Sequence, residues 1–379
     1  MSLNAIPIPS DTPGLSCALQ YYRFGDQGKG AKIFMQAGLH ADEQPGMLIL
    51  HHLLPMLEKA EQEGRLNAEF IVMPMVNPLG MAHMQFHTHR GRYHPQTGVN
   101  YNRNWRDLDA ALFAHSGSLA DQLGQDPDAN KALILDHLRA WHEGFKPVTA
   151  LDHLRHAVTK EAMDADMVLD LHCDDEALNH IFIAPQLMPE YQDLSDWVGA
   201  VATLTEEDSG GGSFDEVWPG LWIKLARRYP DAAWPALPLG ATLEYRGQHD
   251  VEDAINKTDA DHLYGFFVGR GLITDKVQSP PASPPASPLN AMETLRVNQH
   301  GLIAYRVDLG AHVKKGDVIA DLIDLDGQGF ARHRTPITAN TDGVVISRNM
   351  IKYVQPGVSI AKIVGTEPLP WRVGYLLED

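Results

Sequence analysis

The stretch Ile33–Glu43 restricts most strongly what this chain can fold into, because it joins a buried strand to a possible metal site. It reads I-F-M-Q-A-G-L-H-A-D-E, and its first apolar residues are typical of a strand buried on both faces. Gly38 then breaks the strand, and His40 and Glu43 follow at the spacing H-x-x-E. An imidazole and a carboxylate on one turn can supply two of the three protein ligands of a catalytic zinc. The same spacing recurs at His249–Glu252, so it is the strand and glycine before His40 that favour the first copy.

Short apolar runs alternate with helical patterns through the first two thirds of the chain. Strands are expected at Ser16–Tyr22, 33–37, Glu69–Val76, Met167–Leu171, Ile181–Ala184 and Ala241–Tyr245. Helices are expected at Met47–Glu63, Asp107–Phe113, Asn130–Glu143, Thr149–Met163, Tyr191–Leu204 and Val251–Val268. A long polar loop is expected at Met81–Asn104. This alternation predicts the α/β class, with a mixed central sheet flanked by helices.

Composition narrows the possible partners and the compartment. The chain has 379 residues and a net charge of −18, which disfavours nucleic acid and anionic membranes as partners. The two cysteines, Cys17 and Cys173, form no disulfide framework, so a reducing compartment is expected. The N-terminus does not resemble a signal peptide, and no apolar run is long enough to span a membrane. We therefore expect a cytoplasmic protein.

A proline-rich stretch marks the expected domain boundary. Residues 278–289 read Q-S-P-P-A-S-P-P-A-S-P-L, a composition typical of an extended spacer. Beyond it the pattern changes to short strands with glycine turns, and Gly310–Leu322 is echoed by Asp342–Ile363. We expect a catalytic domain at 1–277, a linker at 278–289 and a small all-β, barrel-sandwich-like domain at 290–379.

His172 is the candidate third ligand. It ends the strand pattern V-L-D-L-H, and polar residues that follow strands meet at one edge of an open α/β sheet. With His40 and Glu43 it would leave a fourth metal position for water, as catalysis requires. A structural histidine is the alternative. Asp170, two residues earlier on the same face, could orient the imidazole, although a packing role is an equal alternative.

Glu244 and the long polar loop supply the remaining candidates. Glu244, in T-L-E-Y-R after another strand, could act as the general base, although glutamates at strand ends are usually solvated. The loop carries R-Y-H-P-Q-T-G-V-N-Y-N-R, and arginine can grip carboxylates and developing oxyanions. We assign Arg92 to the polarised carbonyl, with Arg90 as its rival, and Asn102 and Arg103 to a substrate carboxylate. The alternative is a basic loop that balances an acidic protein.

These motifs, in this order, resemble the zinc carboxypeptidase superfamily, and within it the succinylglutamate desuccinylase/aspartoacylase branch. The resemblance spans roughly residues 33–246. It implies a zinc-dependent amidohydrolase that removes a small acyl group from an N-acyl amino acid. It further implies one Zn²⁺ per chain, Glu244 as base, an oxyanion role for one arginine and carboxylate binding by an Asn-Arg pair. The implied metal ligands are His40, Glu43 and His172.

The C-terminal region resembles the biotinyl/lipoyl-like β domain found in bacterial members of this branch. A carrier domain needs a lysine on its hairpin turn, and the turn at 324–334, D-L-D-G-Q-G-F-A-R-H-R, contains none. We therefore expect this domain to shape the mouth of the active site or an oligomer contact. A homo-oligomer is one possibility for the assembly.

Two other functions fit the same residues. One is a zinc carboxypeptidase that trims peptide C-termini, and Asn104-Trp105 after the Asn-Arg pair is the sequence found in such peptidases. The other is a metal-binding or scaffold protein with an inactive site. Retention of Glu244 and Arg92 beside three ligands argues against the scaffold.

Overall fold

The structure is a computed structural model that describes residues 2–115, 119–326 and 333–376. Within these residues, nine strands form one sheet in the order β1-β2-β4-β3-β7-β11-β9-β10-β12. The strands are β1 (Ser2–Pro9), β2 (Ser16–Phe24), β3 (Lys32–Ala37), β4 (Glu69–Met73), β7 (Met167–Asp174), β9 (His180–Ile183), β10 (Ala202–Thr205), β11 (Leu239–Gly247) and β12 (Ser287–Pro288). The central strands are mostly apolar and buried because helices cover both faces of the sheet.

The sheet is mixed, which confirms the predicted α/β class. Strands β4, β3, β7 and β11 run parallel to one another. Strands β1, β2 and β4 pair antiparallel, as do β9 and β11. Strands β3, β7 and β11 lie side by side at the centre, so their carboxyl ends open onto the same edge of the sheet.

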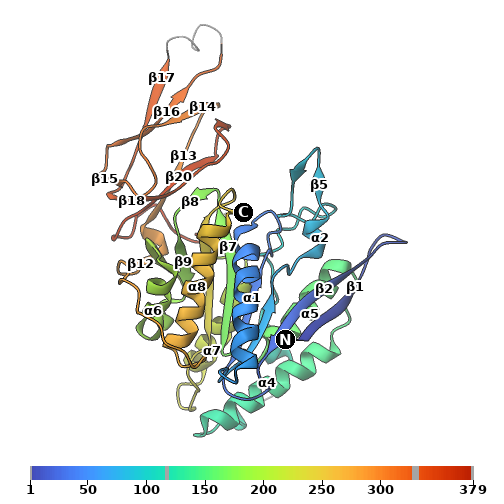
Figure 1. Cartoon of the computed structure of the whole chain (residues 1–379). Coiled ribbons are helices and arrows are strands. Elements are labelled where there is room, and N and C mark those ends of the chain that lie inside the picture. The colour runs from blue at the N-terminus through green and yellow to red at the C-terminus, as the bar shows by residue number, and fades with distance from the viewer. Residues whose placement is uncertain (1, 116–118, 327–332, 377–379) are drawn as a thin grey trace.

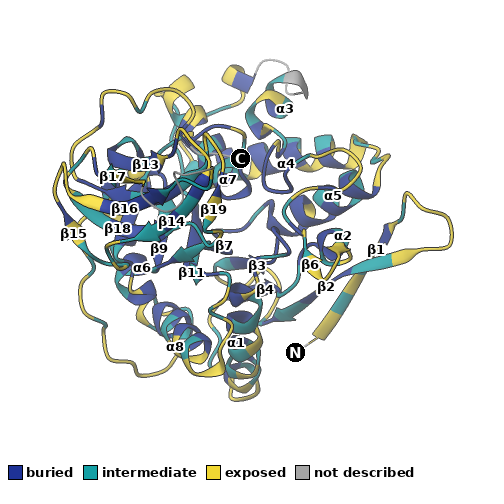
Figure 2. Ribbon diagram, turned by 90° about the horizontal axis from the view of Figure 1, so that it is seen from above, coloured by how far each residue is buried: buried dark blue, intermediate teal, exposed yellow. Residues whose placement is uncertain are grey.

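Helices cover both faces of this sheet (Figures 1 and 2). Helices α1 (Pro45–Gln62), α6 (Met188–Val198) and α8 (Asp253–Gly269) pack on one face, around a core that includes Ile49, Leu194 and Phe266. The other face carries a second core, with Leu112, Ile134, Leu154 and Trp218. Its helices are α3 (Leu108–His115), α4 (Pro127–Gly144), α5 (Ala150–Ala162) and α7 (Phe214–Arg228). Figure 2 shows that the side of each helix turned toward the sheet is buried.

The structure corrects several predicted elements. The helix predicted at Tyr191–Leu204 is wrong beyond Val198, because Gly199 adopts φ +66° and caps the helix. The next residues enter strand β10, at Ala202–Thr205. Strand β1 and helix α7 were not predicted, and Pro219 inside α7 is normally a break signal. The long loop contains α2 (Pro78–Met81) at its start and a hairpin of β5 (Met84–Gln85) and β6 (Thr88–His89).

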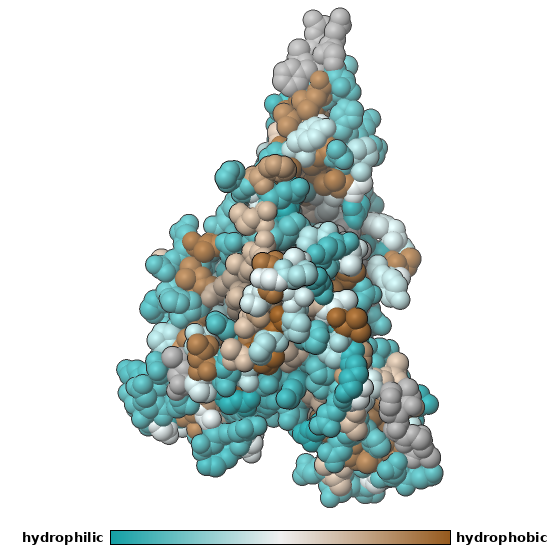
Figure 3. Space-filling model, turned by 90° about the vertical axis from the view of Figure 1, so that its right-hand side faces the viewer, coloured by the Kyte–Doolittle hydropathy of each residue, from teal (hydrophilic) through white to brown (hydrophobic). Residues whose placement is uncertain are grey.

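The C-terminal strands form two further sheets that stand as a narrow projection on the broader N-terminal part (Figures 1 and 3). One has the order β13-β20-β18-β15 and the other β17-β16-β14-β19. The strands are β13 (Met292–Arg296), β14 (Gly301–Tyr305), β15 (His312–Val313), β16 (Val318–Ile323), β17 (Arg334–Thr338), β18 (Gly343–Arg348), β19 (Tyr353–Val354) and β20 (Ser359–Val364). Strand β8 (Glu176–Ala177), directly after β7, pairs with β18 and joins the two parts. Residues 327–332 of the lysine-free turn lie outside the described residues. Among the described helices, none is long and apolar enough to cross a membrane.

Candidate active site

Three adjacent strands place the candidate residues at one edge of the sheet. His40 and Glu43 lie on the turn after β3, which begins at Gly38 with φ +71°, a conformation that glycine adopts without strain. His172 lies inside β7, which continues three residues beyond the predicted end at Leu171. Glu244 lies on β11 directly opposite His172 in the strand register. Residues far apart in the sequence therefore meet because β3, β7 and β11 are neighbours.

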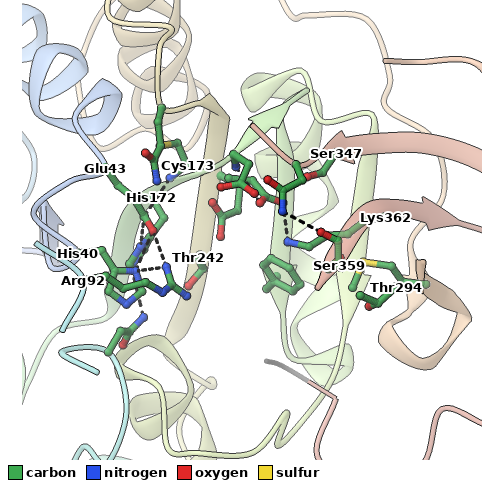
Figure 4. A pocket seen from close by; sticks show the side chains of 18 of the residues that line it. His40, Glu43, Arg92, His172, Cys173, Thr242, Thr294, Ser347, Ser359 and Lys362 are labelled. Carbon is green, nitrogen blue, oxygen red and sulfur yellow. Dashed lines mark hydrogen bonds and ion pairs between the residues drawn. The ribbon is translucent and has the colours of Figure 1, made fainter. Parts of the chain in front are cut away.

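The structure brings His40, Glu43 and His172 together. One ligand atom from each lies within 4.8 Å of the others, and all three side chains are buried. Glu43 is central: its Oε1 lies 2.9 Å from Nδ1 of His40 and its Oε2 lies 2.7 Å from Nδ1 of His172. In Figure 4 the three side chains converge on one side of the cavity. Two imidazoles and a carboxylate at this separation are a donor set for a divalent metal ion.

The outer nitrogens of both imidazoles are held by oxygen atoms. Nε2 of His40 lies 2.8 Å from Oδ1 of Asn100, and Nε2 of His172 lies 3.1 Å from Oδ2 of the fully buried Asp170. Oxygen acceptors at these positions favour protons on Nε2, which leaves both Nδ1 lone pairs directed toward Glu43. Such outer contacts orient metal-binding histidines. The arrangement therefore fits a metal ion. Asp170 lies beside the outer nitrogen of His172, which is the position that its predicted orienting role requires.

Electrostatics also favour the ligand state of two of these groups. Burial disfavours charge on Glu43, but His40 and His172 outweigh it and hold the pKa of Glu43 well below its usual value. Burial and the nearby guanidinium of Arg92 lower the pKa of His40 to about 4. Against the effect of burial, Asp170 and Glu43 raise the pKa of His172 well above its usual value. Metal binding therefore competes with a proton at His172.

Arg92, rather than its rival Arg90, reaches the centre. Nη1 of Arg92 donates a hydrogen bond of 2.9 Å to Oε1 of Glu43 and lies 3.1 Å from Nδ1 of His40. Arg90 is exposed and does not line the cavity. The guanidinium of Arg92 is thus in reach of any oxygen atom that approaches the three candidate ligands.

Asn102 and Arg103 line the same cavity, but the amide of Asn102 has partners inside the protein. Its Oδ1 accepts a hydrogen bond of 2.8 Å from the N–H of Phe214, at the start of α7, and its Nδ2 lies 3.3 Å from Nε2 of His172. Arg103 is buried, and its Nη1 donates to the carbonyl oxygen of Asn102 at 2.9 Å. Asn102 therefore connects the long loop, α7 and the His172 ring.

Glu244 lies beside the candidate ligands and is half-buried. Its Oε2 is buried and has no hydrogen-bond partner among the described residues. Burial, and then the negative charge of Glu43, raise the pKa of Glu244 to about 8. A carboxyl group tuned toward neutral pH is suited to exchange protons during a reaction.

The C-terminal sheets supply a wall of the site whose individual residues the sequence patterns did not reveal. The cavity has a volume of about 750 Å³ and is lined by Met292, Thr294, Ser347, Lys362 and Leu376 as well as by the candidate residues. Figure 4 places Lys362, Ser347 and Ser359 across the cavity from His172. The Lys362 ammonium donates to Oδ2 of Asp174, on β7, at 2.5 Å. A lysine inside the strand pattern S-I-A-K-I was the signal that could have pointed to it.

Comparisons with known proteins agree with this geometry. Residues 29–204 match the family model described as the succinylglutamate desuccinylase/aspartoacylase catalytic domain. The matched segment contains His40, Glu43, Arg92, Arg103 and His172 but ends before Glu244. A comparison with curated proteins finds no match.

Solved structures share the fold over nearly the whole chain. A succinylglutamate desuccinylase/aspartoacylase family protein from Shewanella amazonensis is 24% identical, with a TM-score of 0.82, over 96% of this chain and 98% of that chain. A second protein so described, from Shewanella frigidimarina, is 21% identical, with a TM-score of 0.77 and 96% of each chain covered. The product-bound ectoine utilization protein EutE (DoeB) from Ruegeria pomeroyi is 16% identical, with a TM-score of 0.65, over 96% of this chain and 95% of that chain. Residues 29–204 of this chain are thus similar to the catalytic domain of the succinylglutamate desuccinylase/aspartoacylase family.

Proposed function

We propose that this protein is a zinc-dependent amidohydrolase that removes a small acyl group from an N-acyl amino acid. The observation that carries the proposal is the buried set of His40, Glu43 and His172 with Glu244 on the adjacent strand. Similarity to the succinylglutamate desuccinylase/aspartoacylase family supports a hydrolase of this kind. A zinc ion on these ligands would polarise the scissile carbonyl group and lower the pKa of a water molecule to about 7.

The chain's own residues have distinct roles in this proposal. Glu244 takes a proton from the attacking water and delivers it to the leaving nitrogen, for which a pKa of about 8 is suitable. Arg92 stabilises the negative charge that develops on the carbonyl oxygen. Arg103 binds the substrate carboxylate together with Asn102, which lines the same cavity.

The C-terminal strands support a small substrate. We propose that residues 290–379 are a biotinyl/lipoyl-like β domain, reached through the linker at 278–289, that narrows the mouth of the site. A cavity of about 750 Å³ closed on one side by Lys362 and Leu376 has the size of a small-molecule site. A peptide chain needs an open groove, so this wall favours the deacylase over the carboxypeptidase.

Metal content and substrate specificity test the proposal together. Elemental analysis of protein grown with zinc should find one zinc per chain, and His172→Ala should lose it. The zinc protein should hydrolyse acetyl-, succinyl- or formyl-amino acids and leave peptides of matching C-terminal residues intact. His249→Ala is the control, because His249 is not part of the metal-binding group. Absence of metal, or faster cleavage of the peptides, would contradict the proposal.

A further inference from the structure

One end of the active-site cavity is apolar. Phe182, Met292 and Leu376 all line the cavity, and all three belong to one hydrophobic cluster, so they adjoin one another. Phe182 comes from β9, Met292 begins β13, and Leu376 comes from the segment after β20. Three separate parts of the chain therefore build one apolar surface inside a cavity whose lining also includes charged residues such as Arg103, Glu244 and Lys362.

Leu376 is held in place by the loop that follows β10. Its N–H donates to the carbonyl oxygen of Ser209 at 2.9 Å, and it is 6% exposed. Gly210, with φ +99°, packs against the ring of Tyr375, and a Cβ atom at this glycine would lie 2.2 Å from that ring. The glycine loop and residues 375–376 therefore fit together closely, which fixes the position of the leucine.

The same loop connects the apolar end to the predicted carboxylate site. A Cβ atom at Gly211 would lie 2.5 Å from Cδ of Arg103, so the arginine packs directly on this loop. Gly210 contacts Tyr375 and Gly211 contacts Arg103. A substrate whose carboxylate is bound by Arg103 thus has an apolar surface within the same cavity.

We propose that the substrate carries an aliphatic or aromatic group that binds against Phe182, Met292 and Leu376, and that Leu376 determines specificity for it. The proposal rests on the proposed deacylase function and adds the class of substrate. The apolar group belongs either to the acyl chain or to the amino-acid side chain. Burial of such a group is favourable, whereas a carboxylate at this place would lose water without gaining a charged partner from the three residues.

Paired substrates separate the two sources of the apolar group. The zinc protein is assayed with N-acetyl-leucine against N-acetyl-aspartate, and with N-pentanoyl-glycine against N-succinyl-glycine, with N-acetyl-glycine as reference. We expect kcat/KM to favour the apolar member by about 10-fold or more in at least one pair, because each methylene group in an apolar pocket contributes about 10- to 200-fold. A preference in the first pair places the apolar group in the amino-acid side chain, and a preference in the second pair places it in the acyl chain.

Variants then test the role of Leu376. Leu376→Ala should lower the ratio of kcat/KM for the preferred apolar substrate to that for N-acetyl-glycine by about 10-fold, and should move the preference toward a longer group. Leu376→Met, which nearly conserves volume, should retain most of the ratio. Leu369→Ala is the matched control, because Leu369 is also buried but does not line the cavity. A ratio measured within one variant does not depend on how much of it is folded.

The outcomes distinguish this inference from the proposed function. Absence of hydrolysis of every N-acyl amino acid by the zinc protein would overturn the proposed function. Hydrolysis with a preference for the acidic member of both pairs would overturn the apolar substrate class, whatever the variants do. An unchanged ratio in Leu376→Ala, or an equal change in Leu369→Ala, would overturn the role of Leu376.

Discussion

At the scale of single residues, Glu43 and Glu244 lie in different environments, which suit them to the different roles proposed for them. Glu43 lies between two imidazoles that stabilise its charge, whereas one carboxylate oxygen of Glu244 is buried without a hydrogen-bond partner among the described residues. Two glutamates beside one centre thus have pKa values shifted in opposite directions. Such a split is typical of sites in which one group binds a metal and the other transfers protons.

We expect Glu244→Gln to keep its metal and lose most of its turnover. Glutamine has nearly the same shape but cannot accept a proton, and loss of a general base costs about 10²- to 10⁴-fold in kcat. Metal content and kcat are measured on the same preparation. Glu252→Gln, at the exposed second H-x-x-E copy, serves as the control. Near-normal turnover of Glu244→Gln would place the base elsewhere.

The two arginines should differ in their dependence on substrate charge. Removing one partner of a charge-assisted pair in a desolvated pocket costs about 2–5 kcal/mol. Arg103→Ala should therefore impair kcat/KM for an N-acyl amino acid strongly and for the corresponding amide little, since the amide has no carboxylate. Arg92→Ala should lower kcat for both, because an oxyanion contact strengthens as charge develops. Equal slowing of acid and amide by Arg103→Ala would refute the carboxylate role.

At the scale of elements, helices α4 and α5 meet through a histidine pair that lies away from the site. The rings of His142 and His156 stack with centroids 3.7 Å apart and planes 7° apart. Burial, and then the neighbouring His142, lower the pKa of His156 to about 4. The folded protein thus disfavours the charged form of this side chain relative to the unfolded chain.

The histidine pair should make the protein less stable in mild acid. Because the folded pKa is about 4 and the ordinary value is 6.5, the unfolded state binds more protons between these values. The free energy of unfolding should therefore be unaffected by protonation of His156 above about pH 6.5 and should decrease as the pH falls from 6.5 toward 4. Urea unfolding across this range should show a smaller loss for His156→Gln than for the wild type. If the free energy of unfolding changed equally with pH in His156→Gln and in the wild type, an effect of His156 on acid stability would be excluded.

At the scale of the whole molecule, an ion pair ties the C-terminal sheets to the catalytic sheet. Lys362 on β20 bonds to Asp174 at the end of β7, and both are largely shielded from water. A second pair, Lys352 with Glu176, lies nearby and is more exposed. The first pair also forms part of the cavity wall, so fold and site depend on the same contact.

We expect Lys362→Met to destabilise the protein by about 3 kcal/mol, because it leaves Asp174 charged and shielded without its partner. Lys352→Met, the matched control in an exposed pair, should cost about 0–1 kcal/mol. Chemical denaturation of the two variants in parallel gives the comparison. Equal effects of both substitutions would show that the shielded pair does not hold the two parts together.

Local sequence patterns were sufficient to predict the α/β class and much of the candidate site. Alternation of apolar runs with helical periodicity depends on neighbouring residues, and this is why β3, α1 and β7 lie close to their predicted bounds. Candidate residues that follow strands could be predicted to meet, because parallel strands end at a common edge. The ordered motifs also pointed to the family whose catalytic-domain model matches residues 29–204.

The way in which distant segments complete the site could be seen only in the folded structure. Asn100 faces the outer nitrogen of His40. Lys362 lines the cavity because the pairing of β8 with β18 brings the C-terminal sheets beside β7. Leu376 lines it because residues 375–376 pack against the glycine loop. No local pattern predicts such contacts, because they depend on strand order and on packing between segments far apart in the chain. The sequence thus indicated the kind of chemistry, whereas the fold decided which surface the substrate meets.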